Sequence, residues 1–321
     1  MTNERREDSM NNTDTFHILA LDGGGTRGIY SAQLLNKVEQ LLDVRIKDCF
    51  DLIVGTSTGA IIAGAVVSDI PMDEIVELFE IEAPDIFRER WYRNPLFFSK
   101  YSNENLAQII AKHIPAIPLS EISKPLMITT SEITKSELHI FRSNYTEKLG
   151  ESDYSDGDVC LRDAIVASCA APTFFAPKHI KNHLLADGGL WANNPSVAAY
   201  TEALTNFGKQ ATQVKIMSIG TGHSTAMYRP RRGWGFLLGW GGIKLISYVM
   251  TLQSHASANM VKLLLKNNYL RIDPPIDFWD IDTVVQLENL KSLAERDFTE
   301  HASKIETFFR QSRNSLTASP N

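Results

Sequence analysis

Short apolar runs alternate with segments of helical periodicity along most of this chain. Phe16 to Leu21 is a continuous apolar run that ends at a glycine cluster, a pattern that predicts a buried strand. Apolar residues then recur at helical spacing over 28–43, a second buried strand is predicted over 50–54, and a helix of small and branched residues follows over 61–67. This order of elements is typical of an α/β fold, in which a mostly parallel sheet carries helices on both faces.

The same patterns predict the remaining elements. Further strands are expected over 125–132, 137–142, 184–186, 214–219 and 269–272. Further helices are expected over 72–82, 103–113, 161–170, 195–206, 243–266 and 285–310. Residues 1–15 and 311–321 lack this periodicity, so we expect a disordered N-terminal tail and a flexible C-terminal tail. Because no repeat or linker interrupts the rest, residues 16–310 are predicted to form a single domain.

The composition is that of an ordinary soluble globular protein. Of the 321 residues, 43% are hydrophobic and 22% are charged, and a chain of this length can build a full core. A mainly disordered, collagenous or disulfide-stabilised protein is thereby excluded. Three scattered cysteines (Cys49, Cys160 and Cys169) are too few for a disulfide framework or a zinc site, which favours a reducing cytoplasm.

The charge balance and the absence of long apolar segments narrow the function further. A net charge of −6 argues against DNA or RNA as a partner, because neutralising phosphates requires a basic footprint. Residues 1–15 are polar and carry both signs of charge, unlike a secretory signal peptide. The uncharged window at 52–68 falls short of a membrane span and contains three glycines, so we interpret it as an interior strand, turn and helix.

A glycine-rich loop, residues 22–28 (Asp-Gly-Gly-Gly-Thr-Arg-Gly), follows the first predicted strand and opens a helix. Its first, third and fourth glycines fit the dinucleotide fingerprint G-x-G-x-x-G. That fingerprint requires an acidic residue at the end of the second strand, to bind the ribose. Here the available acids, Asp48 and Asp51, lie at the beginning of that strand, which argues against a dinucleotide-dependent oxidoreductase.

The alternative interpretation of this loop is an oxyanion hole. Consecutive glycines at a helix N-terminus, Gly23, Gly24 and Gly25, would expose backbone N–H groups that favour an anion. Arg27 adds a positive charge nearby. An ordinary strand-to-helix turn would require one glycine, whereas four of these seven residues are glycine, the last of them Gly28.

A second motif, Gly55-Thr-Ser57-Thr-Gly59, fits the G-x-S-x-G pattern between a strand and a helix. Such a turn holds the middle serine in an exposed position, and the small residues around it relieve crowding. Negative charge that develops at Ser57 would be stabilised by the N-terminus of the following helix. A chance turn would fit the five residues as well, but the flanking strand and helix favour a nucleophile.

A serine nucleophile needs a base, and the histidines are poor candidates. Of eight, only His183 and His223 lie near loops that are expected at the sheet edge. Asp187, followed by Gly188 and Gly189 after a short apolar segment, is the better candidate. An aspartate is a weak base at its ordinary pKa of about 3.9, but burial would raise the pKa enough for a Ser–Asp dyad to work at neutral pH. An ordinary Asp-Gly turn remains the alternative for this motif on its own.

Taken together and in this order, the motifs at 22–28, 55–59 and 187–189 resemble those of the patatin-like phospholipases. Two further segments are similar to that family, Ala167-Ser-Cys-Ala-Ala-Pro-Thr-Phe174 and Asn193-Asn-Pro195. The resemblance covers residues 16–222 and leaves 223–310 as a C-terminal helical part. One departure is Phe174, where the family often has serine or alanine, and this difference concerns the acyl pocket.

The resemblance implies a patatin-like three-layer sandwich that hydrolyses the acyl esters of membrane lipids. Ser57 would be the nucleophile, Asp187 its base, and Gly23, Gly24 and Gly25 the oxyanion hole, with Arg27 nearby. The supporting glycines would be Gly28, Gly55, Gly59, Gly188 and Gly189. This chemistry needs neither a metal nor a cofactor. Acyl transfer to another acceptor would use the same dyad, so an acyltransferase remains open.

The segment 228–242 combines arginines with tryptophans and glycines. We consider Arg229, Arg231, Arg232, Trp234 and Trp240 as residues of a lid that contacts an anionic membrane or an activator. The same residue types could stack on and pair with a nucleotide. A buried apolar loop packed on the sheet is the third interpretation.

The overall layout is similar to that of phospholipase effectors of anti-phage systems, which a cyclic oligonucleotide activates. This resemblance implies a cyclic dinucleotide as activator and a cytoplasmic enzyme peripheral to the inner face of the membrane. The rival hypothesis from another functional class is a nucleotide-binding sensor with a vestigial dyad. Phospholipid is the expected partner, and a homo-oligomer is left open.

Overall fold

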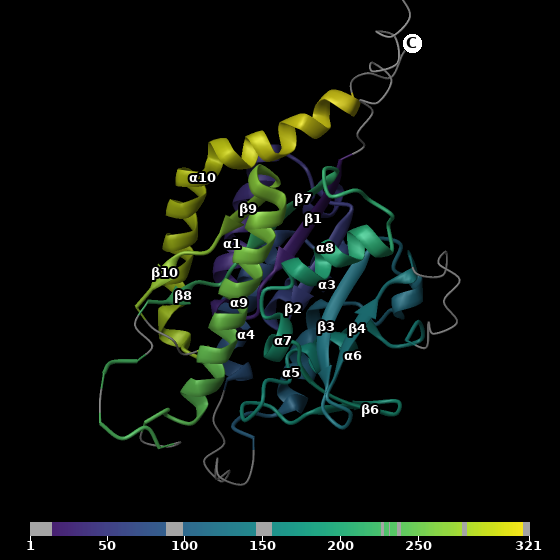
Figure 1. Cartoon of the computed structure of the whole chain (residues 1–321). Helices are drawn as coiled ribbons and strands as arrows, with labels where there is room; N and C mark the ends of the chain where they lie inside the picture. Colours follow the sequence, from purple (N-terminus) through teal and green to yellow (C-terminus); the bar gives the residue numbers. More distant parts are fainter. Residues whose placement is uncertain are drawn as a thin grey trace, which may run out of the picture.

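The computed structural model describes residues 15–87, 99–145, 156–225, 228–230, 232–235, 239–277 and 281–316. Their main sheet has eight strands in the order β5-β6-β3-β2-β1-β7-β9, with β4 paired to β3 (Figure 1). The strands of this sheet are β1 (Phe16–Leu21), β2 (Leu52–Thr56), β3 (Leu126–Glu132), β4 (Glu137–Arg142), β5 (Lys178–Ile180), β6 (His183–Asp187), β7 (Val214–Ile219) and β9 (Tyr269–Ile272). The central pairs β3–β2, β2–β1, β1–β7 and β7–β9 are parallel, whereas β4 and β6 run antiparallel to β3. A small separate pair joins β8 (His223–Ser224) to β10 (Pro275–Ile276).

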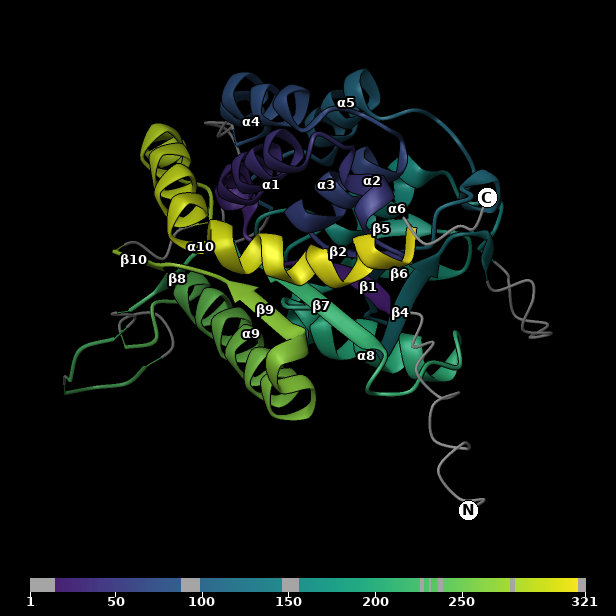
Figure 2. The same ribbon diagram turned by 90° about the horizontal axis from the view of Figure 1, so that it is seen from above.

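Helices cover both faces of this sheet, and Figure 2 shows the resulting three layers. The helices are α1 (Gly28–Leu42), α2 (Ile46–Cys49), α3 (Thr58–Val67), α4 (Met72–Ile86), α5 (Asn103–His113), α6 (Leu161–Ser168), α7 (Gly189–Ala192), α8 (Ser196–Thr205), α9 (Ile243–Leu265) and α10 (Leu287–Leu316). Side chains alternate along β1, so that Leu19 and Leu21 join the core formed by α1, α3 and α4, whereas Ile18 and Ala20 join the core beneath α8 and α9. Because both faces are buried, β1, β2 and β7 are mostly apolar, and their polar residues, such as His17 and Lys215, are buried as well.

The fold agrees with the predicted patatin-like sandwich, and most predicted elements are confirmed. The main shifts concern four elements. The second strand covers 52–56 instead of 50–54, and α3 begins at Thr58 instead of 61. Helix α4 continues to Ile86 instead of 82, and α10 covers Leu287–Leu316 instead of 285–310. The pattern gave no indication of the short strands β5, β8 and β10. Whether 16–310 is one domain, with tails at 1–15 and 311–321, stays a prediction.

Two strands meet end to end on one edge of β3, and this arrangement creates the site. Thr129 pairs with β4 on one side and with Thr56, the last residue of β2, on the other. The next residue, Thr130, pairs with β4 on the same side and with Asp187, the last residue of β6, on the other. Because β2 and β6 run in opposite directions, their ends face each other. Ser57, directly after β2, is thereby brought to Asp187.

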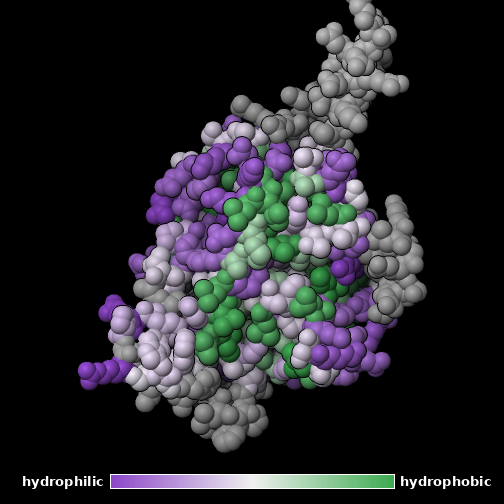
Figure 3. All heavy atoms as spheres, in the orientation of Figure 1, coloured by the Kyte–Doolittle hydropathy of each residue, from purple (hydrophilic) through white to green (hydrophobic). Residues whose placement is uncertain are grey.

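Helix α9 differs from the other helices in the polarity of its outer face. Figure 3 shows a stripe of hydrophobic side chains that runs along this helix at the surface. Several of them are exposed although they are large and apolar, and Leu263 is 78% exposed. No helix among the described residues is long and apolar enough to cross a membrane.

Candidate active site

Ser57 occupies the sharp turn between β2 and α3 in a backbone conformation that side chains rarely adopt. Its φ is 54° and its ψ is −122°, and it forms the N-cap of α3. The turn is tight enough that a Cβ atom on Gly55 would lie 2.3 Å from the carbonyl oxygen of Gly59. Both glycines of the G-x-S-x-G motif are thus required for close packing. The strained serine at the start of a helix is the geometry expected of a nucleophile.

Ser168, at the end of α6, fixes this turn from behind. Its Oγ accepts a hydrogen bond from the N–H of Ser57 at 2.8 Å and donates to the carbonyl oxygen of Thr129 at 2.8 Å. Ser168 is fully buried. The sequence motif included this residue without giving it a role, because only the fold brings α6 to the turn. Ser168 therefore positions the nucleophile relative to the edge of β3.

Asp187 is held by its backbone and by one carboxylate oxygen, while the other oxygen is left without a partner. Its N–H donates to Ala170 O at 3.0 Å, and its carbonyl accepts from Ser131 Oγ at 2.9 Å. Oδ1 accepts from the N–H of Gly189 at 2.7 Å. Oδ2 is buried and accepts no hydrogen bond from the described residues. Unpaired buried acceptors are rare in proteins, which makes this oxygen unusual. Because no described donor occupies it, Oδ2 can accept a proton.

Burial raises the pKa of Asp187 to about 6, as the sequence led us to expect. The Gly189 N–H and the Ser57 hydroxyl both act in the opposite direction and lower the pKa. Ser57 is therefore close to the carboxylate, although the structure shows no direct hydrogen bond between them. Such bonds are often long in a site without substrate. A carboxyl with a pKa of about 6 is still ionised at neutral pH and is a stronger base than an exposed aspartate.

The glycine-rich loop lies next to Ser57, and two of its glycines line the same cavity. Gly24 and Gly25 face this cavity together with Ser57. Gly25 has a φ of +61°, and a Cβ atom there would lie 1.9 Å from the carbonyl oxygen of Ile281. Gly23 differs from them because its N–H donates to Asn193 O at 3.0 Å. Gly24 and Gly25 thus line the cavity beside Ser57, whereas the Gly23 amide is already bonded to Asn193.

Arg27 holds the loop from behind and does not line the cavity. Its Nε donates to Gly24 O at 3.3 Å and its Nη1 to Gly222 O at 3.1 Å, and the side chain is buried. Gly28 packs against Phe79, since a Cβ atom on Gly28 would lie 2.7 Å from that ring. Gly188 fits against the backbone of β3 in the same way.

A buried ion pair anchors the start of the loop. Asp22 accepts two hydrogen bonds from Arg271 of β9, at 2.7 and 2.6 Å. Arg271 also lies 3.1 Å from Asp273, whose carboxylate accepts from the Gly222 N–H and pairs with His223. Sequence reasoning missed Arg271, which is 249 residues away from Asp22. Asp22, the acidic first residue of the motif, could have indicated a partner, because a buried carboxylate needs a cation or several hydrogen-bond donors.

The sequence profile of the patatin-like phospholipases matches residues 19–200. The chain belongs to the patatin-like phospholipase family. Family membership makes it a lipid hydrolase and excludes the dinucleotide-dependent oxidoreductase that the glycine spacing alone would permit. In this family member, the motifs at 22–28 and 55–59 line one cavity, and the motif at 187–189 lies behind its wall, where Gly189 packs against Met250.

Curated relatives of this patatin-like protein carry names that specify an activator. The chain is 30% identical to the cGAMP-activated phospholipase of Escherichia coli (strain TW11681), with 91% of this chain and 92% of the relative covered. It is 27% identical to the cUMP-AMP-activated phospholipase of Escherichia coli, with 80% of each covered. Among solved structures, VipD from Legionella pneumophila has a similar fold, with a TM-score of 0.50, 13% identity, and coverage of 90% of this chain and 67% of VipD.

The cavity beside Ser57 is small and mostly apolar. Its volume is about 40 Å³, which is little more than the space of one water molecule. Phe79, Phe87, Phe174 and Phe175 supply aromatic walls, and Met250 of α9 closes one side. Phe174, the departure noted in the sequence, does line this acyl-sized apolar pocket. The cavity is thus narrow and apolar next to Ser57.

Cys169 is a further neighbour of the dyad. It lines the cavity, and burial and the Asp187 carboxylate raise the pKa of its thiol well above the ordinary value. The Ser57 hydroxyl lowers the same pKa, so Ser57 lies near the thiol as well as near the carboxylate. The thiol therefore stays protonated and is a poor nucleophile.

The histidines considered from the sequence have partners away from Ser57. His183 Nδ1 lies 3.0 Å from Glu132, and His223 Nδ1 lies 3.0 Å from Asp273. In the described part of the chain, His223, His255 and Asp273 are the one group that could offer three ligands to a metal. Arg271 already neutralises the Asp273 carboxylate, which disfavours a cation there.

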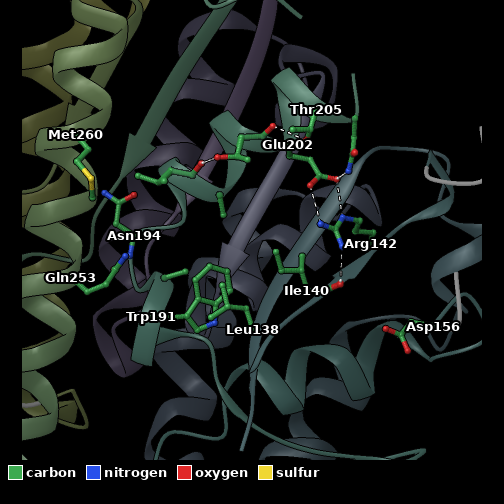
Figure 4. Close-up of a pocket in the computed structure, with 15 residues that line it drawn as sticks. Leu138, Ile140, Arg142, Asp156, Trp191, Asn194, Glu202, Thr205, Gln253 and Met260 are labelled. Atoms are coloured by element: carbon green, nitrogen blue, oxygen red, sulfur yellow. Dashed lines mark hydrogen bonds and ion pairs between the residues drawn. The ribbon is translucent and has the colours of Figure 1, made fainter. Parts of the chain in front are cut away.

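A larger groove of about 720 Å³ lies between β4, α8 and α9 (Figure 4). Ala192 separates it from the nucleophile turn, since its carbonyl accepts from Thr56 Oγ1 at 2.6 Å. Arg142 is the only cation among the described lining residues, and Glu202 binds it at 2.8 and 3.0 Å. The groove is therefore a poor site for a phosphate-rich ligand.

The described residues of the segment 228–242 form an aromatic cluster at the N-terminal end of α9. Tyr228 contacts Trp234 and Trp240, with ring centroids 5.9 and 5.5 Å away, and Trp234 contacts Trp240 at 5.3 Å. Trp234 is 43% exposed. Arg229 and Arg232 are also exposed, and Arg231 lies outside the described residues. This exposure disagrees with the interpretation of a loop buried against the sheet.

Proposed function

We propose that the protein is a phospholipase A-type acyl hydrolase in which Ser57 and Asp187 form the catalytic dyad. The observation that carries this proposal is the meeting of the ends of β2 and β6 on one edge of β3, which puts a strained serine beside a carboxylate with a free oxygen. The pKa of that carboxyl, about 6, suits a general base at neutral pH.

In the proposed reaction, Ser57 Oγ attacks the ester carbonyl while Asp187 Oδ2 accepts the hydroxyl proton. The carbonyl electrons move to the oxyanion, to which the amides of Gly24 and Gly25 donate. Collapse of this intermediate expels the lysophospholipid alkoxide, which takes the proton back from Asp187. Water then attacks the acyl-enzyme, Asp187 accepts its proton, and the fatty acid leaves as Ser57 is reprotonated.

The narrow cavity supports an enzyme that is activated by widening its site. We infer that the walls around Met250 and the phenylalanines move when an acyl chain enters. The named activators of the relatives suggest what moves them. We infer that a cyclic dinucleotide opens the site and that the enzyme then degrades membrane phospholipid in anti-phage defence, working in the cytoplasm at the inner face of the membrane.

The segment 228–242 is proposed as the first point of membrane contact. Exposed Arg229 and Arg232 would bind anionic headgroups, and Trp234 would lie among the glycerol groups, where tryptophan is favoured. Arg231 and Trp240 belong to the same proposal. A nucleotide-binding role for these residues is an outcome that the experiment below distinguishes.

The deciding experiment measures fatty acid release from mixed phospholipid vesicles with and without a panel of cyclic dinucleotides. Wild type is compared with Ser57→Ala and Asp187→Asn, and with Asp158→Asn as a control because that carboxylate is exposed. We expect nucleotide-dependent release that both dyad variants abolish and the control retains. Equal release with and without every nucleotide would contradict the activator. Nucleotide binding without any release would favour a sensor, and acyl transfer to an added alcohol faster than to water would favour an acyltransferase.

A further inference from the structure

Acidic residues are absent from a long stretch of this acidic protein. Between Glu202 and Asp273 the sequence has no aspartate or glutamate, although the chain contains 38 of them. The same stretch contains nine basic residues, namely Lys209, Lys215, Arg229, Arg231, Arg232, Lys244, Lys262, Lys266 and Arg271. Helix α9 lies within it and carries no acidic side chain. Apart from Arg271, which is paired with Asp22 and Asp273, this stretch therefore adds basic residues without acidic ones to a protein whose net charge is −6.

The outer face of α9 is apolar as well as free of acid. Its exposed apolar side chains are Val249, Leu252, Ala256, Met260, Leu263 and Leu264. From 249 through 252, 256 and 260 to 263 or 264, successive positions are three or four residues apart. They therefore form a single stripe along the helix, which Figure 3 shows. Lys262 and Lys266 are exposed close to Leu263. The combination of an apolar stripe with lysines is typical of helices that lie in a membrane interface.

The buried side of the same helix lines the cavity beside Ser57. Met250 follows Val249 in the helix, lines the cavity beside Ser57, and packs against Gly189 next to the base. The aromatic cluster of Tyr228, Trp234 and Trp240 extends the stripe at its N-terminal end, where Tyr248 of α9 contacts Tyr228 at 5.3 Å. A surface that binds the stripe thus also touches the helix that lines the cavity.

A second copy of the chain is the other candidate for an occupant of this face. In a symmetric dimer, each α9 stripe would meet its own equivalent, and two positive regions would be brought together without an acidic partner. An anionic phospholipid surface complements both properties, since the acyl region takes the apolar side chains and the headgroups take the lysines. Charge therefore favours the lipid over the copy.

We propose that the outer face of α9, together with the exposed Trp234, is the surface by which the protein docks on anionic phospholipid bilayers. This inference rests on the proposed lipid hydrolase function and names the face that meets the substrate. Docking on α9 places the bilayer against the helix that carries Met250, so that binding and opening of the site are mechanically linked.

The test measures sedimentation of the full chain with vesicles of phosphatidylethanolamine and phosphatidylglycerol, and with vesicles of phosphatidylcholine alone. The Ser57→Ala background prevents hydrolysis during the assay. We expect Leu252→Ser/Leu263→Ser to weaken binding to the anionic vesicles at least tenfold. Lys262→Glu/Lys266→Glu should weaken it about tenfold, and raised salt should reduce the difference between the lipids. Ile81→Ser/Val44→Ser and Lys135→Glu/Lys181→Glu are the matched controls on other surfaces, and both should bind like the parent.

Three further measurements keep this proposal separate from the proposed reaction. Hydrolysis of a soluble short-chain ester, with the nucleotide present, should be equal in wild type and in the α9 variants with Ser57 intact, whereas vesicle hydrolysis should fall at least tenfold. Absence of ester hydrolysis in wild type would overturn the reaction and leave the docking result standing. Unchanged vesicle binding in both α9 variants would overturn the docking surface. Light scattering tests the alternative occupant. If wild type were an oligomer and the α9 variants were monomers that bind vesicles unchanged, α9 would be the interface between copies and the docking surface would be overturned.

Discussion

Two buried aspartates, Asp22 directly after β1 and Asp187 at the end of β6, belong to the same sheet and yet lie in opposite electrostatic settings. Burial raises the pKa of Asp187 to about 6. At Asp22, Arg271 opposes the effect of burial and lowers the pKa through its charge and two short hydrogen bonds. Among the described residues, Asp187 has no cation as a partner and receives the N–H of Gly189 on one oxygen only.

The difference shows how one fold uses the same side chain for structure and for chemistry. The Asp22 carboxylate is saturated by Arg271 and by Ser254, so its role is to fix the beginning of the glycine-rich loop. The Asp187 carboxylate keeps a free oxygen whose proton affinity is enhanced by burial. A carboxylate that acts as a base needs an oxygen without a hydrogen-bond partner, whereas a carboxylate that fixes a loop needs partners on both oxygens.

The largest expected effect is on hydrolysis when each carboxylate is replaced by its amide. Asp187→Asn cannot accept the Ser57 proton, so we expect kcat/KM to fall by about 10³-fold or more. Asp22→Asn keeps the dyad and disturbs only the placement of Gly24 and Gly25, so the expected loss is about 10–100-fold. Steady-state kinetics on a soluble ester measure both. Equal losses in the two variants would remove the distinction between base and anchor.

For the free energy of unfolding, we expect Asp22→Asn to be the damaging change and Asp187→Asn to be stabilising. The pKa of Asp187 is raised from 3.8 to about 6, so its ionised form costs the folded state up to about 3 kcal/mol at pH 7. Asp187→Asn should therefore increase the free energy of unfolding at pH 7, and this gain should shrink toward pH 4, where the wild-type carboxyl is protonated in the folded state. Asp22→Asn leaves Arg271 without its main partner and should decrease the free energy of unfolding by about 3 kcal/mol. Urea denaturation at both pH values measures these changes, and destabilisation by Asp187→Asn would show that its charge is compensated.

Asp187 and Asp22 also differ in how much of their setting the sequence contains. The elements around Asp187 follow from local patterns, because continuous apolar runs predicted β1 and β7 and the G-x-S-x-G spacing predicted the nucleophile turn. The end-to-end meeting of β2 and β6 does not follow, since β6 is short and its antiparallel direction is set by pairing with β3.

The setting of Asp22 depends on contacts that no local pattern encodes. Arg271 reaches it from β9, which enters the sheet beside β7. Ser168 reaches the nucleophile turn from α6 in the same non-local way. The Gly23 amide, expected in the oxyanion hole, donates to Asn193 because the loop after β6 folds back over it. Motif spacing predicted Ser57 and Asp187 as the reacting residues, whereas the residues that position these two required the fold.

The pH dependence of kcat/KM also distinguishes Asp187 from Asp22, although the expected change in rate is smaller than in the amide variants. Asp187 must be ionised to act as base, so kcat/KM should fall about tenfold per pH unit as the pH drops below about 6. Asp22→Asn should retain this acid limb at reduced overall activity, because the base is unchanged. Rates on a soluble ester between pH 4.5 and 8 measure the limb. If Asp22→Asn lost the acid limb of kcat/KM, the group that titrates near pH 6 would be Asp22 and not Asp187.

The smallest effect is expected at Cys169, the remaining titratable neighbour of Asp187. Burial and the carboxylate keep its thiol protonated, so it cannot replace Ser57 as the nucleophile or Asp187 as the base. Cys169→Ala leaves Ser57 and its hydrogen bond to Ser168 in place, and we expect kcat/KM to change less than about threefold with the acid limb still near pH 6. Ser168→Ala is the informative comparison, since it removes the bond that fixes the nucleophile and should lower kcat by about tenfold with little change in KM. A large loss in Cys169→Ala together with a shifted acid limb would mean that the thiol, and not burial alone, sets the proton affinity of Asp187.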